Sequence, residues 1–364
     1  MTSRVPLPLM LVALLAGAAA FVAGVMRHPF EAWSVYLVNL MFWSGLSAGG
    51  IVFAALLELT GATWAMDVRP IAARFAWFLP VALALFLVLL RGVRVIFPWV
   101  AHPPAAHPIW FSVGSFALRD SAALVVLFVS AVWFTERSRA RAGRAGGRVT
   151  ITAVSLVIVY AIAVSLWTID LIMSLQPGWA STLFPAYIFT GNLYGAIAAL
   201  SVAAAAGPRL SAGQVALDES AARDLAKLLL GFALFWLYLY WSQYLTIWYG
   251  NLPREFEFLV SRMRGTWWPA AWSVFGLCFV IPFVALLARS ARRPLPVTIV
   301  ALGCLAGLWL EQLVLIAGGH HLDVAALWIG AGVTVAFAAL FMLTLAAASA
   351  RDEESRSTMA GGRT

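Results

Sequence analysis

Ten long apolar runs constrain this chain of 364 residues more than any other feature. A helix of roughly 20 apolar residues crosses the roughly 30 Å hydrocarbon layer of a bilayer. Each backbone polar group in such a span is satisfied within the helix itself. We therefore predict an all-α integral membrane protein with about ten transmembrane helices, at residues 7–26, 35–61, 74–93, 110–134, 150–175, 183–206, 225–249, 269–289, 296–317 and 325–348.

The composition agrees with a membrane location. Hydrophobic residues make up 63% of the chain and charged residues only 11%, whereas a soluble domain needs a charged surface against water. Aromatic residues make up 13%, and the 17 tryptophans suit the membrane–water interface. The net charge of +8 would suggest nucleic acid binding in a soluble protein, but here basic residues in short loops indicate topology.

The basic residues predict which side each loop faces. Five arginines lie within residues 136–148, and positively charged loops stay in the cytoplasm. With this loop inside, 17 basic residues face the cytoplasm and 6 face outward, and Arg119 lies within a span. Both termini are then cytoplasmic. Residues 1–350 form a single transmembrane domain, and residues 351–364 form a polar tail that we expect to be disordered.

Two outer loops are candidates for docking a partner. Residues 94–109 are rich in proline, which opposes a helix, and residues 250–268 carry aromatic and acidic side chains. A rigid loop of this kind suits a docking surface, although a simple interfacial turn explains it equally well. The docking candidates here and in the loop after residue 175 are His102, His107, Trp179, Trp248, Asn251 and Glu255.

Charged side chains inside the spans are the strongest site candidates, because placing a charge in hydrocarbon costs several kcal/mol. Most of these side chains, and the polar residues near them, lie in the outer half of the membrane, while Glu58 lies near the inner end of its span. The candidates are Glu58, Arg119, Asp120, Asp170, Ser174, Ser242, Gln243 and Glu311.

These residues admit a structural and a functional interpretation. A buried ion pair, such as Arg119 with Asp170, would lock two helices together. Alternatively, six of them would line one polar path that carries protons or holds a quinone headgroup. Asp170 and Ser174 are four residues apart and therefore share a helix face. The six residues are Arg119, Asp120, Asp170, Ser174, Ser242 and Gln243.

The sequence gives no support for a redox centre or a catalytic constellation in this chain. Cys278 and Cys304 stand alone in apolar runs, and no Cys-x-x-Cys occurs. No histidine lies mid-span, whereas a transmembrane haem needs paired histidines. His320, in a short outer loop, fits a solvated turn better than a metal site. We therefore expect no haem, cluster or metal bound by the chain itself.

Three segments resemble one family, the NrfD-like (NrfD/PsrC-like) membrane subunits. They are YLVNLMFWSGLSAGG at residues 36–50, WTIDLIMSLQPGWAST at residues 167–182 and YWSQYLTIWYGNLPRE at residues 240–255. The resemblance runs along the second to ninth spans and is closest to the ActF subunits of bacterial alternative complex III. Asp170, Ser174, Ser242 and Gln243 match motif positions, and Arg119 with Asp120 follows a similar pattern in the fourth span.

The resemblance implies two four-helix bundles, made of spans 2–5 and 6–9 and flanked by spans 1 and 10. A short likeness between residues 42–48 and 189–195 suggests the same internal duplication, although close helix packing explains it too. The family also implies the bacterial inner membrane and three kinds of partner: an iron–sulfur subunit, c-type cytochrome subunits and a second NrfD-like subunit.

The resemblance implies a role in quinol:electron-acceptor oxidoreduction, through assembly, the quinone-site environment and proton translocation. It further implies that one of two NrfD-like subunits holds the quinol, and this chain resembles the other kind; the residues leave open which subunit binds it. Two alternatives stay open: a secondary transporter, whose broken helices would surround a substrate site, and a membrane anchor without chemistry of its own.

Overall fold

A computed structural model describes residues 7–104, 107–140, 148–176, 178–210, 219–320 and 327–361. Within this part of the chain ten helical segments are long and apolar enough to cross a membrane, which confirms the all-α multi-span prediction. They are Leu7–Arg27, Pro29–Leu59, Val68–Leu89, Val113–Arg139, Val149–Leu175, Phe184–Ala206, Glu219–Gly250, Gly265–Leu287, Pro294–Ala317 and Trp328–Asp352.

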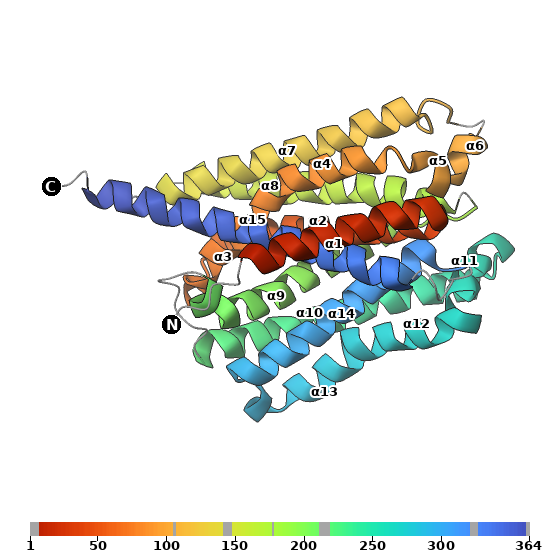
Figure 1. The fold of residues 1–364 in the computed structure, drawn as a ribbon. Helices are drawn as coiled ribbons and strands as arrows, with labels where there is room; N and C mark the ends of the chain where they lie inside the picture. Colours follow the sequence, from red (N-terminus) through yellow and green to blue (C-terminus); the bar gives the residue numbers. More distant parts are fainter. Residues whose placement is uncertain are drawn as a thin grey trace.

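Seven spans are single, continuous α-helices. Their prolines lie only in the first turn or, in α9, also in the last turn, so no proline interrupts a helix interior. Figure 1 shows them running side by side along one axis. These helices are α1 (Leu7–Arg27), α2 (Pro29–Leu59), α7 (Val113–Ala140), α9 (Phe184–Leu210), α10 (Glu219–Gly250), α14 (Pro294–Ala317) and α15 (Leu327–Gly361).

The other three spans change helix type on the way. In the third, α3 (Val68–Arg74) passes through a 3₁₀ turn (Phe75–Phe78) into α4 (Leu79–Leu89), whose first turn holds Pro80. The fifth and eighth contain π-helical turns, which often occur at functional sites. The fifth consists of α8 (Arg148–Trp167), a π turn (Thr168–Ile172) and a 3₁₀ turn (Met173–Leu175). The eighth consists of α12 (Trp268–Phe275), a π turn (Gly276–Val280) and α13 (Ile281–Leu287).

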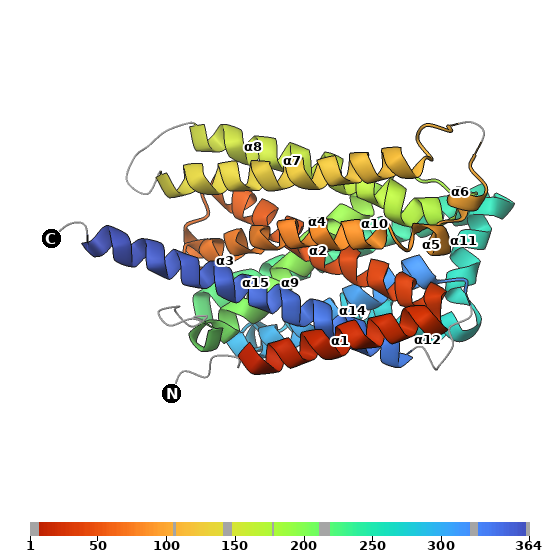
Figure 2. The same ribbon diagram turned by 45° about the horizontal axis from the view of Figure 1, so that its top comes forward.

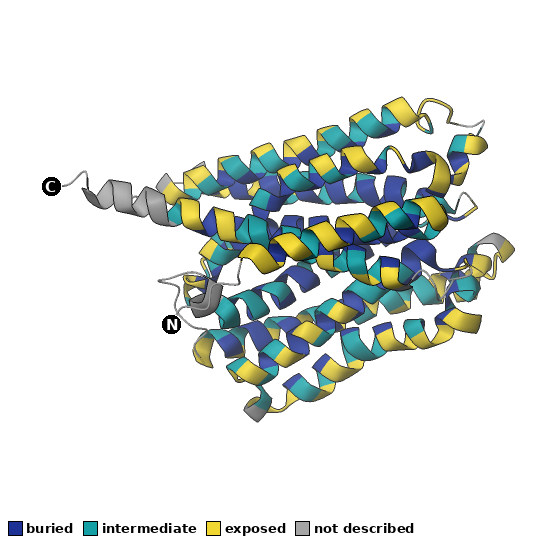
Figure 3. Ribbon diagram, viewed as in Figure 1, coloured by how far each residue is buried: buried dark blue, intermediate teal, exposed yellow. Residues whose placement is uncertain are grey.

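Helix α2 lies at the centre of the molecule, and 89% of its most apolar window is buried (Figure 3). On one side it packs with α4, α7 and α8; we call these four helices the first bundle. On its other side it contacts α9 and α14, which pack with α10, α12 and α13 in the second bundle. Helices α1 and α15 pack against each other, and α1 is largely exposed.

The two bundles meet closely where α2 crosses α9. A Cβ atom added to Gly45 would lie 2.2 Å from Oδ1 of Asn192, and one added to Gly49 would lie 2.4 Å from the Asn192 backbone oxygen. Glycines at this crossing therefore let the two backbones approach. Gly45 and Asn192 occupy matching positions in the two segments that suggest an internal duplication.

Helix α1 begins and α15 ends at the same end of the molecule, which we call the terminal end (Figures 1 and 2). The short helices α5 (Val93–Ile96), α6 (Pro98–Ala101) and α11 (Pro253–Met263) lie at the opposite, distal end. Helix α15 continues to Gly361, so it includes most of the segment for which composition predicts disorder. Asp352 there forms ion pairs with Arg74 and Arg139.

Candidate functional site

The first bundle contains the ion pair between Arg119 and Asp170, which the sequence analysis gave as the structural interpretation of these charged residues. Nε of Arg119, on α7, lies 2.7 Å from Oδ2 of Asp170, on the π turn that follows α8. The side chains are 15% and 3% exposed, so the pair is largely buried. A buried pair of this kind is costly to break, because the remaining charge loses its partner.

Further hydrogen bonds fix this pair in place. Trp110 donates its indole N–H to Oδ1 of Asp170 at 3.1 Å, and the Arg119 guanidinium lies 3.8 Å from the centroid of the Trp110 ring. Arg119 also donates to Ser115 at 3.0 Å. Ser174 donates to the backbone oxygen of Asp170 and accepts a bond from Trp99 at 3.1 Å. The network therefore leaves the pair little freedom to move.

Asp120 is a second buried carboxyl group beside this pair. It is 0% exposed, and neither of its oxygens has a hydrogen-bond partner among the described residues. Asp170 and Arg119 lie close enough for their charges to act on it. Ionising a carboxyl group without a partner is costly in a low-dielectric interior. Asp120 is therefore the residue of this cluster with the most capacity left for a further bond.

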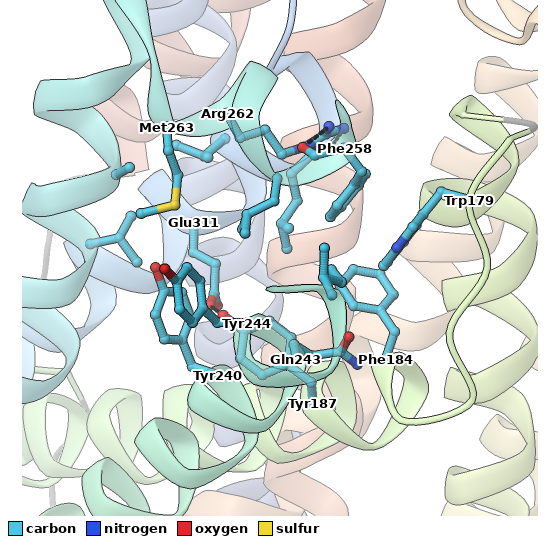
Figure 4. Close-up of a pocket in the computed structure, with 16 residues that line it drawn as sticks. Trp179, Phe184, Tyr187, Tyr240, Gln243, Tyr244, Phe258, Arg262, Met263 and Glu311 are labelled. Atoms are coloured by element: carbon cyan, nitrogen blue, oxygen red, sulfur yellow. Dashed lines mark hydrogen bonds between the residues drawn. The ribbon is translucent and has the colours of Figure 1, made fainter. Parts of the chain in front are cut away.

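The second bundle contains a cavity at the distal end, below α11 (Figure 4). It encloses about 670 Å³ of space not filled by atoms, its mouth included. Its lining comes from the segment before α9 and from α9, α10, α11, α12 and α14. Most of the lining is aromatic or aliphatic, including Phe184, Tyr240, Tyr244 and Phe258.

Glu311 places a carboxyl group among these rings. Its Oε1 accepts hydrogen bonds from the Tyr187 hydroxyl and, at 2.9 Å, from the Trp236 indole N–H. Its Oε2 has no hydrogen-bond partner among the described residues. The side chain is 4% exposed. Two donors thus orient the acid through one oxygen and leave the other oxygen for a ligand.

Arg262 on α11 forms part of the roof of the cavity. Its guanidinium donates to the backbone oxygen of Leu315 at 2.9 Å and to the Gln176 side chain at 3.0 Å. No carboxylate within the described part of the chain pairs with it, and burial lowers the pKa of Arg262 to about 9. The group therefore remains a cation at neutral pH. It also lies 3.8 Å from the centroid of Phe258.

Trp179 forms one wall of the cavity. Its ring stacks on Phe258 with 3.7 Å between centroids and 3° between planes, and the residue is 4% exposed. Its buried indole N–H has no hydrogen-bond partner among the described residues. Unpartnered donors of this kind are rare in protein interiors. The cavity therefore has both an unsatisfied donor and an open acceptor in its lining.

The structure does not bring the six predicted polar residues together. Arg119, Asp120, Asp170 and Ser174 lie in the first bundle. Gln243 lines the cavity of the second bundle and bonds with Ser181 at 2.9 Å. Ser242 donates instead to the backbone of its own helix, at the Tyr238 oxygen.

Glu58 and all the docking candidates except Trp179 lie apart from both polar sites. Glu58 pairs with Arg69 at the terminal end. Trp179 is buried in the cavity wall and therefore offers no docking surface. Glu255 is partly exposed, and the exposed docking candidates at the distal end are His102, His107, Trp248 and Asn251.

Sequence reasoning missed the donors around Glu311. Tyr187 and Trp236 are aromatic residues in apolar runs, and nothing in such a run indicates which ring bonds to an acid. In the sequence Arg262 indicates only topology, as one of the six basic residues predicted to face outward, but the structure buries it. One available signal was the spacing of Phe258 and Arg262, which places a ring and a cation on one face of an amphipathic helix.

The chain was also compared with known proteins, and neither a protein-family model nor a curated protein matches its sequence.

Proposed function

We propose that this chain is a membrane subunit of a quinol:electron-acceptor oxidoreductase complex in a bacterial inner membrane. In this proposal the complex is of the alternative complex III type, with iron–sulfur, c-type cytochrome and second NrfD-like subunits as partners. The observation that carries the proposal is the cavity below α11, where Glu311 stands among aromatic rings in a membrane-spanning bundle.

The lining of the cavity suits a quinol ring. Such a ring is flat and apolar, and it carries an oxygen at each of two opposite positions. Aromatic walls stack on flat rings, and Tyr240 and Tyr244 supply them. Oε2 of Glu311 can accept a bond from a ring hydroxyl, and the N–H of Trp179 can donate to a ring oxygen. The apolar surroundings strengthen both interactions.

Oxidation of a quinol to a quinone releases two electrons and two protons. Haem and iron–sulfur groups in the partner subunits would supply the one-electron acceptors for these electrons. The protons pass one after the other to Glu311 and then to water at the open mouth of the cavity. A carboxyl group suits this role because it can accept a proton from the quinol and then release the same proton.

The proposal places the quinol in this chain, whereas the family resemblance alone favours the paralogous subunit. A photoactivatable azidoquinone added to membranes that contain the complex tests the difference. We expect covalent label on residues 179–187, 236–247 and 258–263, and protection by excess unmodified quinol. Label confined to the first bundle or to a partner subunit would contradict the cavity assignment.

Co-purification tests the complex itself. After extraction in a mild detergent, the chain should elute with haem-containing partners and show their visible absorption bands. A chain that purifies alone and without colour, yet moves a solute across vesicle membranes, would be a transporter instead. If the chain retains its partners but binds no quinol, its role as a subunit of a redox complex would stand, and only the assignment of the cavity as the quinol site would be wrong.

A further inference from the structure

A second cavity lies between the two bundles at the distal end. It encloses about 600 Å³ of space not filled by atoms, its mouth included. It shares no lining residue with the cavity below α11. The first bundle and its loop contribute Ser34, Arg94 and Leu175, while Ile316 at the end of α14 and His320 lie on the side of the second bundle.

Ser34 is an unusual serine in the wall of this cavity. It is 3% exposed, and its hydroxyl has no hydrogen-bond partner among the described residues. Serines in helices commonly donate to the backbone oxygen four residues earlier, as Ser165 and Ser201 do in this chain. The Ser34 hydroxyl lacks that bond, so it remains available to a ligand in the cavity.

Arg94 adds a positive charge at the same cavity. It is exposed, and no carboxylate in the described ranges lies within ion-pair distance of it. In contrast, Arg69 and Arg119 each pair with an acid. A guanidinium binds phosphate oxygens through two parallel hydrogen bonds, which gives strong and directional recognition. Arg94 is therefore the cationic contact for an anion at this mouth.

His320 completes the polar part of the lining. Its ring lies 4.5 Å from that of Phe30, centroid to centroid, and its backbone oxygen accepts a bond from Trp267 at 2.9 Å. Burial lowers the pKa of His320, and the charge of Arg262 lowers it further. The neutral ring still offers one N–H donor. An anion bound next to it would favour the protonated ring and gain a second positive contact.

We infer that this cavity binds the phosphate-bearing headgroup of an anionic phospholipid. Arg94 and Ser34 hold the phosphate oxygens, and an acyl chain lies along the apolar part of the wall. The position supports a lipid over a soluble anion, because the cavity opens at the ends of the spans, where headgroups lie. Most of its remaining lining is apolar, namely Phe30, Val95, Ile96, Phe97, Leu175 and Ile316. A lipid here would bridge the two bundles.

The test uses the full chain, with its retained partners, in detergent from which lipid has been removed. Phosphatidylglycerol, phosphatidylcholine and inorganic phosphate are added separately, and the thermal midpoint and the retained lipid are measured. We expect phosphatidylglycerol to raise the midpoint and to be retained stoichiometrically. Arg94→Gln should weaken retention roughly tenfold or more, since a charge-assisted bond is lost, and Ser34→Ala should weaken it less.

Arg91→Gln is the matched control, because Arg91 is an exposed arginine three residues earlier that does not line the cavity. It should retain phosphatidylglycerol as the unaltered chain does. Equal losses in the Arg91 and Arg94 variants would overturn the inference, as would equal retention of phosphatidylcholine. Stabilisation by inorganic phosphate alone, to the same extent and with the same dependence on Arg94, would assign the site to a soluble anion rather than a lipid.

Discussion

Arg119 and Asp170 connect the fourth and fifth spans through a buried ion pair, with Nε of the arginine 2.7 Å from Oδ2 of the aspartate. The pair joins a regular helix to a π turn, and Trp110 covers it from the distal end. Because both partners are held by further hydrogen bonds, the geometry favours a role in holding the bundle together. It also makes the two interpretations of Asp170 experimentally separable.

Asp170→Asn should destabilise the chain by about 3–5 kcal/mol, because it leaves the buried Arg119 without its counter-charge. The measurement is the thermal midpoint and the yield of complex after extraction. Asp120→Asn is the comparison, since the described residues place no cation within ion-pair distance of the Asp120 carboxyl, whereas Asp170 pairs with Arg119; it should destabilise the chain less than Asp170→Asn does.

Proton transfer by Asp170 predicts a different result for the same variant. The complex would then assemble in normal yield, while quinol oxidation and proton release per electron would fall, because an amide cannot carry a proton in turn. Normal yield with unchanged activity and unchanged proton release would contradict both roles.

Glu311→Gln should slow quinol oxidation by about 10²–10⁴-fold, the range for loss of a general base. The amide preserves the size of the side chain and can still accept bonds from Tyr187 and Trp236. We therefore expect normal assembly, and kcat of the purified complex is the measurement. Gln312→Met, at the neighbouring position outside the cavity lining, is a control for the loss of a polar side chain in α14. Unchanged kcat in the Glu311 variant would remove Glu311 from the proposed reaction.

The pKa of His320 predicts how stability depends on pH. Burial, followed by the charge of Arg262, lowers the pKa in the folded chain below the ordinary value near 6.5. As pH falls through about 6.5, the unfolded chain therefore binds the proton first, and the folded state loses stability. The loss stops below the folded-state pKa.

His320→Gln removes the pH-dependent part of the stability that His320 contributes. The difference in thermal midpoint between the unaltered chain and this variant should therefore shrink or reverse as pH falls from 8 to 5. Arg94 and Arg262 are the charged groups on the neighbouring elements. Arg94→Gln should leave the pH dependence in place, while Arg262→Gln should reduce it. A difference that grows at low pH would mean that the histidine gains a carboxylate partner instead.

The orientation predicted from the arginines can be tested with single cysteines. Gly143→Cys lies in the loop predicted to be cytoplasmic, outside the described residues, and His102→Cys lies at the exposed distal end. The native Cys278 and Cys304 are buried and give little background. An impermeant thiol reagent on intact cells should label position 102 and spare position 143. The reverse pattern would invert the topology.

The spans could be predicted from the sequence because the length of an apolar run is set by the bilayer, whatever the packing. The observed and predicted ends of the spans differ by a few residues, because the membrane–water interface accepts both polar and apolar residues. Helix α2, for example, begins six residues before the predicted start of its span. The Arg119–Asp170 pair was foreseeable as well. A charge of each sign at similar depth has few ways to be satisfied in hydrocarbon.

The division of the polar residues between the two bundles could not be predicted. The depth of a residue in the membrane does not determine the rotation of its helix about the helix axis, nor which bundle the helix joins. Gln243 and Asp170 lie at similar depth in different bundles. Their relation depends on the close crossing of α2 and α9, which only packing determines. The sequence predicts Trp179 as a docking residue in the loop after residue 175. Its stacking on Phe258 buries it, and that contact depends on where α11 folds back.

Two glycines at the crossing of α2 and α9 give the sharpest test of how the bundles meet. Gly49→Ala would place its Cβ 2.4 Å from the backbone oxygen of Asn192, and Gly45→Ala would place its Cβ 2.2 Å from the Asn192 side chain. Both should destabilise the chain by about 1–3 kcal/mol through overpacking. Gly231→Ala, with nothing within 4 Å of the added Cβ, should cost nothing.

Adding Asn192→Ala to each glycine variant distinguishes the effects of the two glycine substitutions. Asn192→Ala shortens the side chain that Gly45→Ala meets, so it should restore much of the stability of that variant. It cannot relieve Gly49→Ala, because the backbone oxygen stays where it is. The measurement is the thermal midpoint of the two double variants against the Asn192→Ala chain. Equal rescue of both would mean that α9 shifts as a rigid helix, and the contact between the bundles would then be less closely fitted than these distances indicate.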